Sequence, residues 1–189
     1  MRETHKLLEK YAASLSAIIT NLDFAAVGRL IELILETRNN GKTIFFIGNG
    51  GSASTASHFA NDLSIGTRLS HNPIKSVALT DNLSVITAIA NDFGYEFVFS
   101  KQLAYLGSQG DLLISISASG NSPNLIEATE AAKSCGINTF ALVAFDGGML
   151  KQISDDSIHV LTDHGEYGLA EDCHLAINHM IAKFIKNNQ

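Results

Sequence analysis

The spacing of apolar residues predicts most of the secondary structure of this chain. Over residues 3–37 they recur three and four positions apart, which predicts two amphipathic helices broken near Asn21. Farther along, short runs rich in β-branched and aromatic residues alternate with segments of helical spacing. The runs predict strands at 42–48, 74–80, 111–117, 137–145 and 156–162, and the segments between and after them predict helices at 52–66, 83–93, 124–136 and 171–187.

This alternation of strand and helix sets the expected fold class. Strands that are apolar throughout and separated by helices form a parallel sheet buried on both faces. We therefore expect an α/β fold: a three-layer, doubly wound sheet of five parallel strands, preceded by N-terminal helices. No linker, low-complexity run or internal repeat interrupts residues 1–189, which predicts one domain.

Composition and charge exclude several classes of function. The chain has 189 residues, of which 46% are hydrophobic and 17% charged, as in an ordinary globular domain. A net charge of −6, with 13 scattered lysines and arginines, offers no basic stripe for nucleic acid. The charged opening does not resemble a secretory signal, and no uncharged apolar run reaches the ~18 residues of a membrane span. Cys135 and Cys173 are too few for a disulfide framework, so we expect a reducing cytoplasm and no membrane.

The first candidate binding loop lies where strand 42–48 gives way to a helix. It contains Gly48, Asn49, Gly50, Gly51 and Ser52. Glycines let the backbone approach a ligand closely, and the free amides at a helix start attract an anion. A phosphate or a sugar hydroxyl would fit there. A tight turn followed by a serine cap is the simpler interpretation of this loop alone.

A second loop follows strand 111–117 and strengthens the first. Ser117, Ser119 and Ser122 surround Gly120 just before another predicted helix, and hydroxyls with helix-start amides can hold a phosphate without lysine or arginine. Ligands of open α/β sheets bind at such strand ends. Neither loop fits GxxxxGK[ST], which argues against a nucleotide triphosphatase. The first fits the relaxed dinucleotide pattern GxGxxA, but Asp81 comes too late for the usual ribose contact, so that signal is weak.

Acids and histidines gather in two of the predicted helices. His58 and Asp62 are four residues apart on one helical face. In the last helix Glu171, Asp172, His174 and His179 form a second group, with Asp172 and His179 nearly aligned. Carboxylates and imidazoles beside a bound sugar phosphate suit proton transfer, and the same side chains bind zinc. Taken singly, each is more typical of a surface or structurally satisfied residue.

Over essentially its whole length the chain resembles the sugar isomerase (SIS) domain family, and within it the phosphoheptose isomerases. The resemblance rests on IGNGGSASTASHFANDL near position 50, AIANDFGYEFVFSKQL at 88–103, ISASGNSPNLIEA at 116–128, DGG at 146–148 and EDCHLAINHM near the end. It implies a flavodoxin-like SIS domain over residues 1–189, with 1–40 as a helical oligomerisation segment. It also implies a cytoplasmic homotetramer with active sites between subunits that isomerises sedoheptulose 7-phosphate for lipopolysaccharide or capsule precursors.

The same resemblance assigns site residues. The catalytic acid falls on Asp62 and the late catalytic histidine on His179. Zinc, one ion per subunit, would be held by His58, Asp62, Glu171 and His179. The residues implied to bind substrate are Asn49, Gly50, Gly51, Ser52, Asp92, Ser117, Ser119, Ser122 and Glu171. Glu171 and His179 are about 12 Å apart along an ideal helix, so all four ligands meet only at an irregular helix start or between subunits.

The chain departs from the family pattern at four positions. Asp62 replaces a glutamate, which shortens the acid by about 1.5 Å. Ala118 replaces the threonine between two phosphate serines, Glu171 replaces a glutamine, and Gly168 replaces an acid. These changes leave the activity class as expected but make the identity of the substrate less certain than the reaction type.

Two other functions compete with an aldose–ketose isomerase. One is a non-catalytic SIS protein that binds a phosphosugar or a protein partner, as in the branch that associates with a replication initiator. That branch lacks both the acid and the late histidine, whereas this chain has Asp62 and His179. The other is a phosphosugar-sensing regulatory domain, which is usually fused to a DNA-binding module that this chain has no room for. The residues therefore favour an enzyme.

Overall fold

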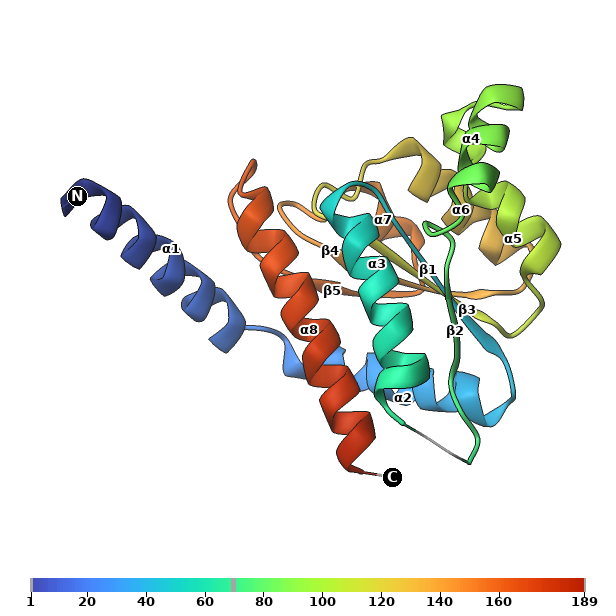
Figure 1. The fold of residues 1–189 in the computed structure, drawn as a ribbon, viewed down its shortest axis with the longest axis horizontal. Coiled ribbons are helices and arrows are strands. Elements are labelled where there is room, and N and C mark those ends of the chain that lie inside the picture. Colours follow the sequence, from blue (N-terminus) through green and yellow to red (C-terminus); the bar gives the residue numbers. More distant parts are fainter. Residues whose placement is uncertain (1, 69–70, 189) are drawn as a thin grey trace.

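The computed structural model describes residues 2–68 and 71–188, which form a three-layer α/β fold (Figure 1). Its five strands are all parallel, in the order β2-β1-β3-β4-β5. The strands are β1 (Thr43–Gly48), β2 (Lys75–Ala78), β3 (Leu112–Ser117), β4 (Asn138–Val143) and β5 (Asp156–His159). The helices are α1 (Arg2–Thr20), α2 (Phe24–Asn39), α3 (Gly51–Asn61), α4 (Leu83–Asp92), α5 (Ser100–Leu106), α6 (Pro123–Ser134), α7 (Gly148–Ile153) and α8 (Tyr167–Asn187). This strand order is the flavodoxin-like one, so the expected fold class is confirmed.

Successive residues of the central strands supply two hydrophobic cores, one on each face of the sheet. Phe46 of β1 packs into the core that α2, α3 and α8 cover, and its ring lies 4.8 Å from that of Phe59. The next residue, Ile47, points into the other core, which α5, α6 and α7 cover. Alternation of side chains along a strand thus explains why the sequence showed unbroken apolar runs rather than an apolar and polar alternation.

The observed elements differ from the predicted ones mainly at their ends. Three of the predicted strands are two or three residues too long at their carboxyl ends, because buried residues such as Leu79 and Phe145 continue into loops outside the ladder. Helix α8 begins at Tyr167 rather than 171, because Gly168 inside the first turn weakens the helical pattern. Helix α3 continues into a π-helical turn, η1 (Asp62–Gly66), within the predicted 52–66 segment. Short helices α5 and α7 were not predicted.

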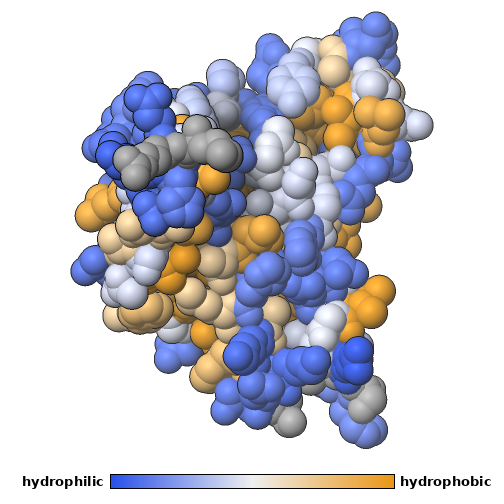
Figure 2. All heavy atoms as spheres, turned by 60° about the vertical axis from the view of Figure 1, so that its left-hand side comes forward, coloured by the Kyte–Doolittle hydropathy of each residue, from blue (hydrophilic) through white to orange (hydrophobic). Residues whose placement is uncertain are grey.

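Two helices carry apolar surface that the chain itself does not cover. Helix α1 extends away from the sheet in Figure 1 and contacts α8, while Leu7 and Leu8 remain 68% and 64% exposed. Figure 2, in which this side comes forward, shows apolar side chains interspersed among hydrophilic ones. Helix α4 is rich in apolar residues, yet none of its residues is buried. No helix in the described ranges is both long and apolar enough to cross a membrane.

Candidate active site

The loop after β1 makes a sharp turn that only glycine allows. Gly50 adopts φ 55° and ψ −123° immediately before α3 begins at Gly51. At Gly48 a Cβ atom would lie 2.5 Å from the carbonyl oxygen of Ser52, closer than real atoms approach. The glycines therefore bring the first turn of α3, with its free amides, directly against the end of the strand.

The loop after β3 presents serine hydroxyls beside a second helix start. The Ser117 Oγ accepts a hydrogen bond from the Gly120 amide at 3.1 Å, and the Ser119 Oγ accepts one from the Asn121 amide at 3.3 Å. Ser122 is the N-terminal cap residue of α6, but its side chain makes no capping bond. Each of these hydroxyls therefore keeps its proton free to donate to a ligand.

The DGG motif at 146–148 packs against this serine loop. A Cβ on Gly120 would lie 2.1 Å from the Gly147 carbonyl oxygen, and one on Gly148 would lie 2.3 Å from the Ser119 carbonyl oxygen. The Leu150 amide also donates to the Gly120 carbonyl at 2.9 Å. Backbone therefore packs on backbone here, which explains why the sequence has glycine on both sides of the contact.

The two loops line one cavity of about 290 Å³, because β1 and β3 are neighbours in the sheet. Its lining consists of Asn49, Gly50, Gly51, Ser52, Ile116, Ser117, Ala118, Ser119, Ser122, Leu125, Tyr167 and Glu171. Every residue predicted to bind substrate is present except Asp92. That residue ends α4, receives a hydrogen bond from the Asn91 amide group at 2.8 Å, and lies outside the lining.

Two features of this cavity bear on its chemistry. None of the described lining residues is a lysine or arginine, so hydroxyls and helix-start amides are the donors that an anion would meet. Glu171 of α8 lies over Gly51, where a Cβ atom would come within 2.2 Å of its Oε2. An alanine at position 51 would therefore displace the Glu171 carboxylate from the first turn of α3.

Side-chain amides fix one wall of the cavity. The amide groups of Asn49 and Asn124 exchange two hydrogen bonds, each 2.9 Å long. The Tyr95 hydroxyl, in the 3₁₀ turn η2 (Tyr95–Phe97), donates to the Asn49 Oδ1 at 3.0 Å. Asn124, Tyr95 and Tyr167 were not singled out from the sequence, and only their polar or aromatic character beside the loop motifs could have suggested them.

A second group of side chains lies where α3 ends beside α8. The His58 Nε2 is 3.4 Å from the Asp62 Oδ2, and the His179 Nε2 is 3.9 Å from the same oxygen. The two imidazole Nε2 atoms are 3.4 Å apart. Asn178, missed in the sequence, donates to the Asp62 Oδ2 at 3.1 Å and holds the carboxylate in place.

This group fits a divalent metal ion. One donor atom from each of His58, Asp62 and His179 lies within 4.8 Å of the others, so a single ion could contact all three. Two imidazoles and a carboxylate are ligands that zinc accepts, and three protein ligands leave a fourth position for a substrate oxygen or a further side chain. The residues present therefore suit the metal that the family resemblance implies.

Glu171 does not join that group within one chain, contrary to the expected four-ligand set. It sits in a regular part of α8, eight residues and about 12 Å along the helix from His179. An irregular helix start, one of the two conditions for the four to meet, is thus absent in the described residues. Within one chain the candidate metal-binding group therefore consists of His58, Asp62 and His179.

The cluster that the sequence suggested in α8 is dispersed over different faces of the helix. Asp172 accepts a hydrogen bond from the Tyr11 hydroxyl at 2.6 Å, and this contact raises the pKa of Tyr11 to about 12. His174 points into the core and is fully buried. Burial lowers the pKa of His174 to about 4. Neither Asp172 nor His174 therefore shares a site with His179.

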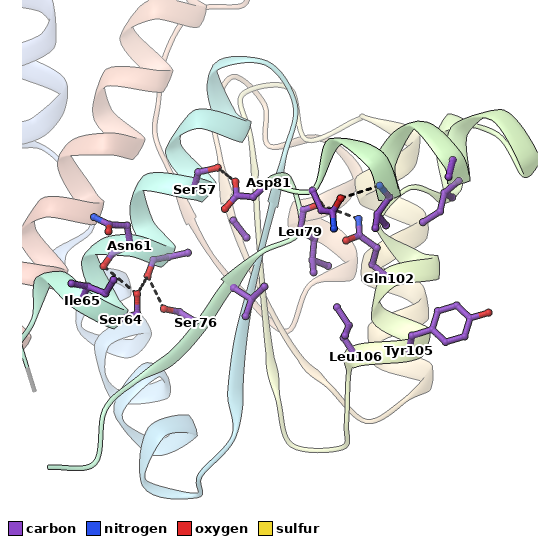
Figure 3. Close-up of a pocket in the computed structure, with 17 residues that line it drawn as sticks. Ser57, Asn61, Ser64, Ile65, Ser76, Leu79, Asp81, Gln102, Tyr105 and Leu106 are labelled. Carbon is purple, nitrogen blue, oxygen red and sulfur yellow. Dashed lines mark hydrogen bonds between the residues drawn. The ribbon is translucent and has the colours of Figure 1, made fainter. Parts of the chain in front are cut away.

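A larger cavity, about 840 Å³, lies beside edge strand β2 and is distinct from the loop cavity. Figure 3 shows Ser57 of α3 pointing toward Asp81, to which its hydroxyl donates, and Gln102 of α5 beside Leu79. Apolar residues of α4, including Val85 and Ile89, complete the lining. Among the described residues that line this groove there is no pair of a carboxylate and an imidazole, and its apolar character suits packing better than catalysis.

Comparison with known proteins agrees with this geometry. The SIS domain family matches residues 8–144. A phosphoheptose isomerase from Chlorobaculum parvum is 36% identical over 179 residues, covering 94% of this chain and 85% of that protein. One from Helicobacter pylori is 39% identical over 158 residues, covering 84% of this chain and 81% of that protein.

A solved structure gives the same result in three dimensions. The phosphoheptose isomerase from Neisseria gonorrhoeae superposes with a TM-score of 0.86 at 32% identity, and the match covers 98% of both chains. The similarity thus extends from the N-terminal helices to the last helix and includes both strand-end loops. The chain therefore belongs to the SIS domain family.

Proposed function

We propose that this protein is an aldose–ketose isomerase that converts sedoheptulose 7-phosphate to D-glycero-D-manno-heptose 7-phosphate, a precursor of heptose-containing glycans such as lipopolysaccharide or capsule. The observation that carries the proposal is the pairing of a serine-lined cavity at the β1 and β3 strand ends with a carboxylate and two imidazoles. The names of the relatives above support the same reaction. A protein that only bound a partner would have no need of such a group.

The phosphate of the substrate would bind in the Ser117–Ser122 loop. Ser119 and Ser122 donate their hydroxyl protons to it, and the N-terminal turn of α6 adds the positive end of its dipole. Asn49 and Ser52 then face the sugar hydroxyls from the opposite wall. Recognition by neutral donors predicts that substrate binding depends only weakly on salt concentration.

Proton transfer falls to Asp62 and His179. One of the two removes the proton from C1 of the ketose, and the resulting enediol takes a proton at C2 to give the aldose. The other moves the hydroxyl proton from O1 to O2, so that no atom is gained or lost overall. Asn178 orients the Asp62 carboxylate for this task through its hydrogen bond.

The metal-binding group adds to this chemistry. His58, Asp62 and His179 would hold the zinc ion, with Glu171 of a neighbouring subunit as a further ligand. A bound zinc ion polarises the carbonyl oxygen of a substrate and stabilises negative charge on it. With or without it, the residues of this chain supply the phosphate anchor and the groups that carry protons.

A homotetramer in the cytoplasm is the assembly that we propose. His58 lies about 10 Å beyond Gly51 along α3, so the proton-transfer group and the loop cavity of one chain stand well apart. A second copy would bring the histidines of one chain to the cavity of another. The uncovered apolar faces of α1 and α4 and the groove beside β2 supply surface for such contacts.

Isotope incorporation tests the reaction directly. Purified protein is mixed with sedoheptulose 7-phosphate in deuterium oxide, and NMR follows formation of the aldose and deuterium at its C2 or at C1 of the ketose. We expect both signals from the wild type and from Asp163→Asn, whose carboxylate is exposed and belongs neither to the lining of the loop cavity nor to the metal-binding group. Absence of aldose and of deuterium in the wild type would refute the proposal.

A further inference from the structure

Tyr95 reaches the loop cavity from outside its lining. Gly94, with φ 113° and ψ 153°, turns the chain after α4 so that η2 passes beside the end of β1. The Tyr95 ring is 54% exposed, so the ring itself contributes little to the core. Its hydroxyl donates to the Asn49 Oδ1 at 3.0 Å and makes no other hydrogen bond to the described residues.

Asn49, which accepts that hydrogen bond, forms a pair of reciprocal amide hydrogen bonds with Asn124. Asn49 and Asn124 each donate one N–H and accept one, at 2.9 Å in both directions. Exchanging oxygen and nitrogen in both side chains would keep both of these bonds. The pair alone therefore does not decide whether Asn49 offers an N–H donor or a carbonyl acceptor on its remaining side.

The Tyr95 hydroxyl breaks this symmetry. A phenol donates a hydrogen bond more readily than it accepts one, because the ring withdraws the oxygen lone pair. It therefore favours the arrangement in which the Asn49 oxygen faces Tyr95 and accepts two bonds, from Tyr95 and from Asn124. The second N–H of the Asn49 amide has no acceptor among the described residues, and Asn49 lines the cavity.

We infer that Tyr95 is a positioning residue that sets the polarity of the Asn49 amide, so that the cavity presents an N–H donor to a substrate oxygen. The inference rests on the proposed function, since it assigns Asn49 to a sugar oxygen. The donor would be in place before the substrate binds, and it would act equally on the ground state and the transition state. Its loss therefore raises KM and leaves kcat nearly unchanged.

Tyr95→Phe removes the hydroxyl and keeps the ring. We expect KM for sedoheptulose 7-phosphate to rise about three- to tenfold, the effect of one neutral hydrogen bond, with kcat within about twofold of the wild type. Tyr105→Phe is the matched control, because the Tyr105 ring is 88% exposed at the rim of the other cavity and its hydroxyl bonds to none of the described residues. An unchanged KM in Tyr95→Phe would overturn the inference.

A double-mutant cycle separates positioning from a structural role. If Tyr95 acts through the Asn49 amide, Tyr95→Phe adds no further rise in KM once Asn49→Ala is present. A rise of the same size in both backgrounds would show that the hydroxyl acts elsewhere and would overturn the inference.

Calorimetry measures the binding of the sugar phosphate directly, so it tests the inference without requiring turnover. If the wild type binds sedoheptulose 7-phosphate without isomerising it, the proposed reaction fails, while the inference still requires a three- to tenfold weaker Kd in Tyr95→Phe. Equal Kd values for the two proteins, or no binding to the wild type, would overturn it.

Discussion

Substituting Gly148 with alanine would test whether the DGG segment sets the position of the serine loop. The new Cβ would lie 2.3 Å from the Ser119 carbonyl oxygen and 2.7 Å from the Gly120 carbonyl carbon. Ordinary contacts begin near 3.4 Å, so one backbone segment must move by about 1 Å. Because Gly148 is the first residue of α7, we expect the serine loop to be the segment that moves.

Two costs combine in this substitution. Gly148 has φ 55°, and an alanine in the left-handed region costs about 1 to 2 kcal/mol. Overpacking against backbone adds about 1 to 3 kcal/mol, so the free energy of unfolding should fall by about 2 to 5 kcal/mol. A displaced loop also loses part of its hydrogen bonding to phosphate, and we expect KM for the sugar phosphate to rise at least tenfold, about 1.4 kcal/mol of binding.

Gly41→Ala is the matched control. Gly41 has φ 68°, but nothing lies within 4 Å of a Cβ built there, so it bears the conformational cost without the clash. Urea denaturation at equal protein concentration measures the unfolding free energy, and initial rates give KM. We expect Gly41→Ala to lose about 1 to 2 kcal/mol and to keep the wild-type KM. If Gly148→Ala matched it in both measurements, the supporting role of the DGG segment would be refuted.

Three further predictions follow from the sites. Asp62→Asn and His179→Gln should each lower kcat by about 10²- to 10⁴-fold with little change in KM, and steady-state rates that kept kcat intact would exclude their role in proton transfer. Ser119→Ala combined with Ser122→Ala should raise KM at least tenfold; an unchanged value would remove the phosphate from that loop. The pKa of His174 is lowered from 6.5 to about 4 in the folded protein. Between these two pH values the imidazole is protonated in the unfolded chain but not in the folded one. The free energy of unfolding that is present above pH 6.5 is therefore lost as the pH falls toward 4. Urea titrations should show that the wild type loses about 2 kcal/mol more than His174→Met between pH 7 and 5; equal losses would contradict this.

Local sequence was sufficient for the five strands, for most of the helices and for the position of both candidate binding loops. Apolar spacing indicates which face of a segment is buried. Glycine, serine and proline mark the ends of strands, because their backbone preferences act over a few residues. The serine loop and the Gly48–Ser52 turn were therefore identifiable before the fold was known. Their meeting in one cavity depends on β1 and β3 being neighbours in the sheet, which the structure shows.

The tertiary structure decided which side chains of α8 lie close to one another and to other helices. Along the sequence Glu171, Asp172, His174 and His179 look like one cluster, but a helix turns about 100° per residue and sends them to four different surroundings. Glu171 reaches Gly51, Asp172 meets Tyr11, and His174 is buried. His179 joins Asp62, which is 117 residues earlier, because α3 and α8 pack side by side. Contacts of this range depend on how helices cross the sheet, and no local pattern encodes that.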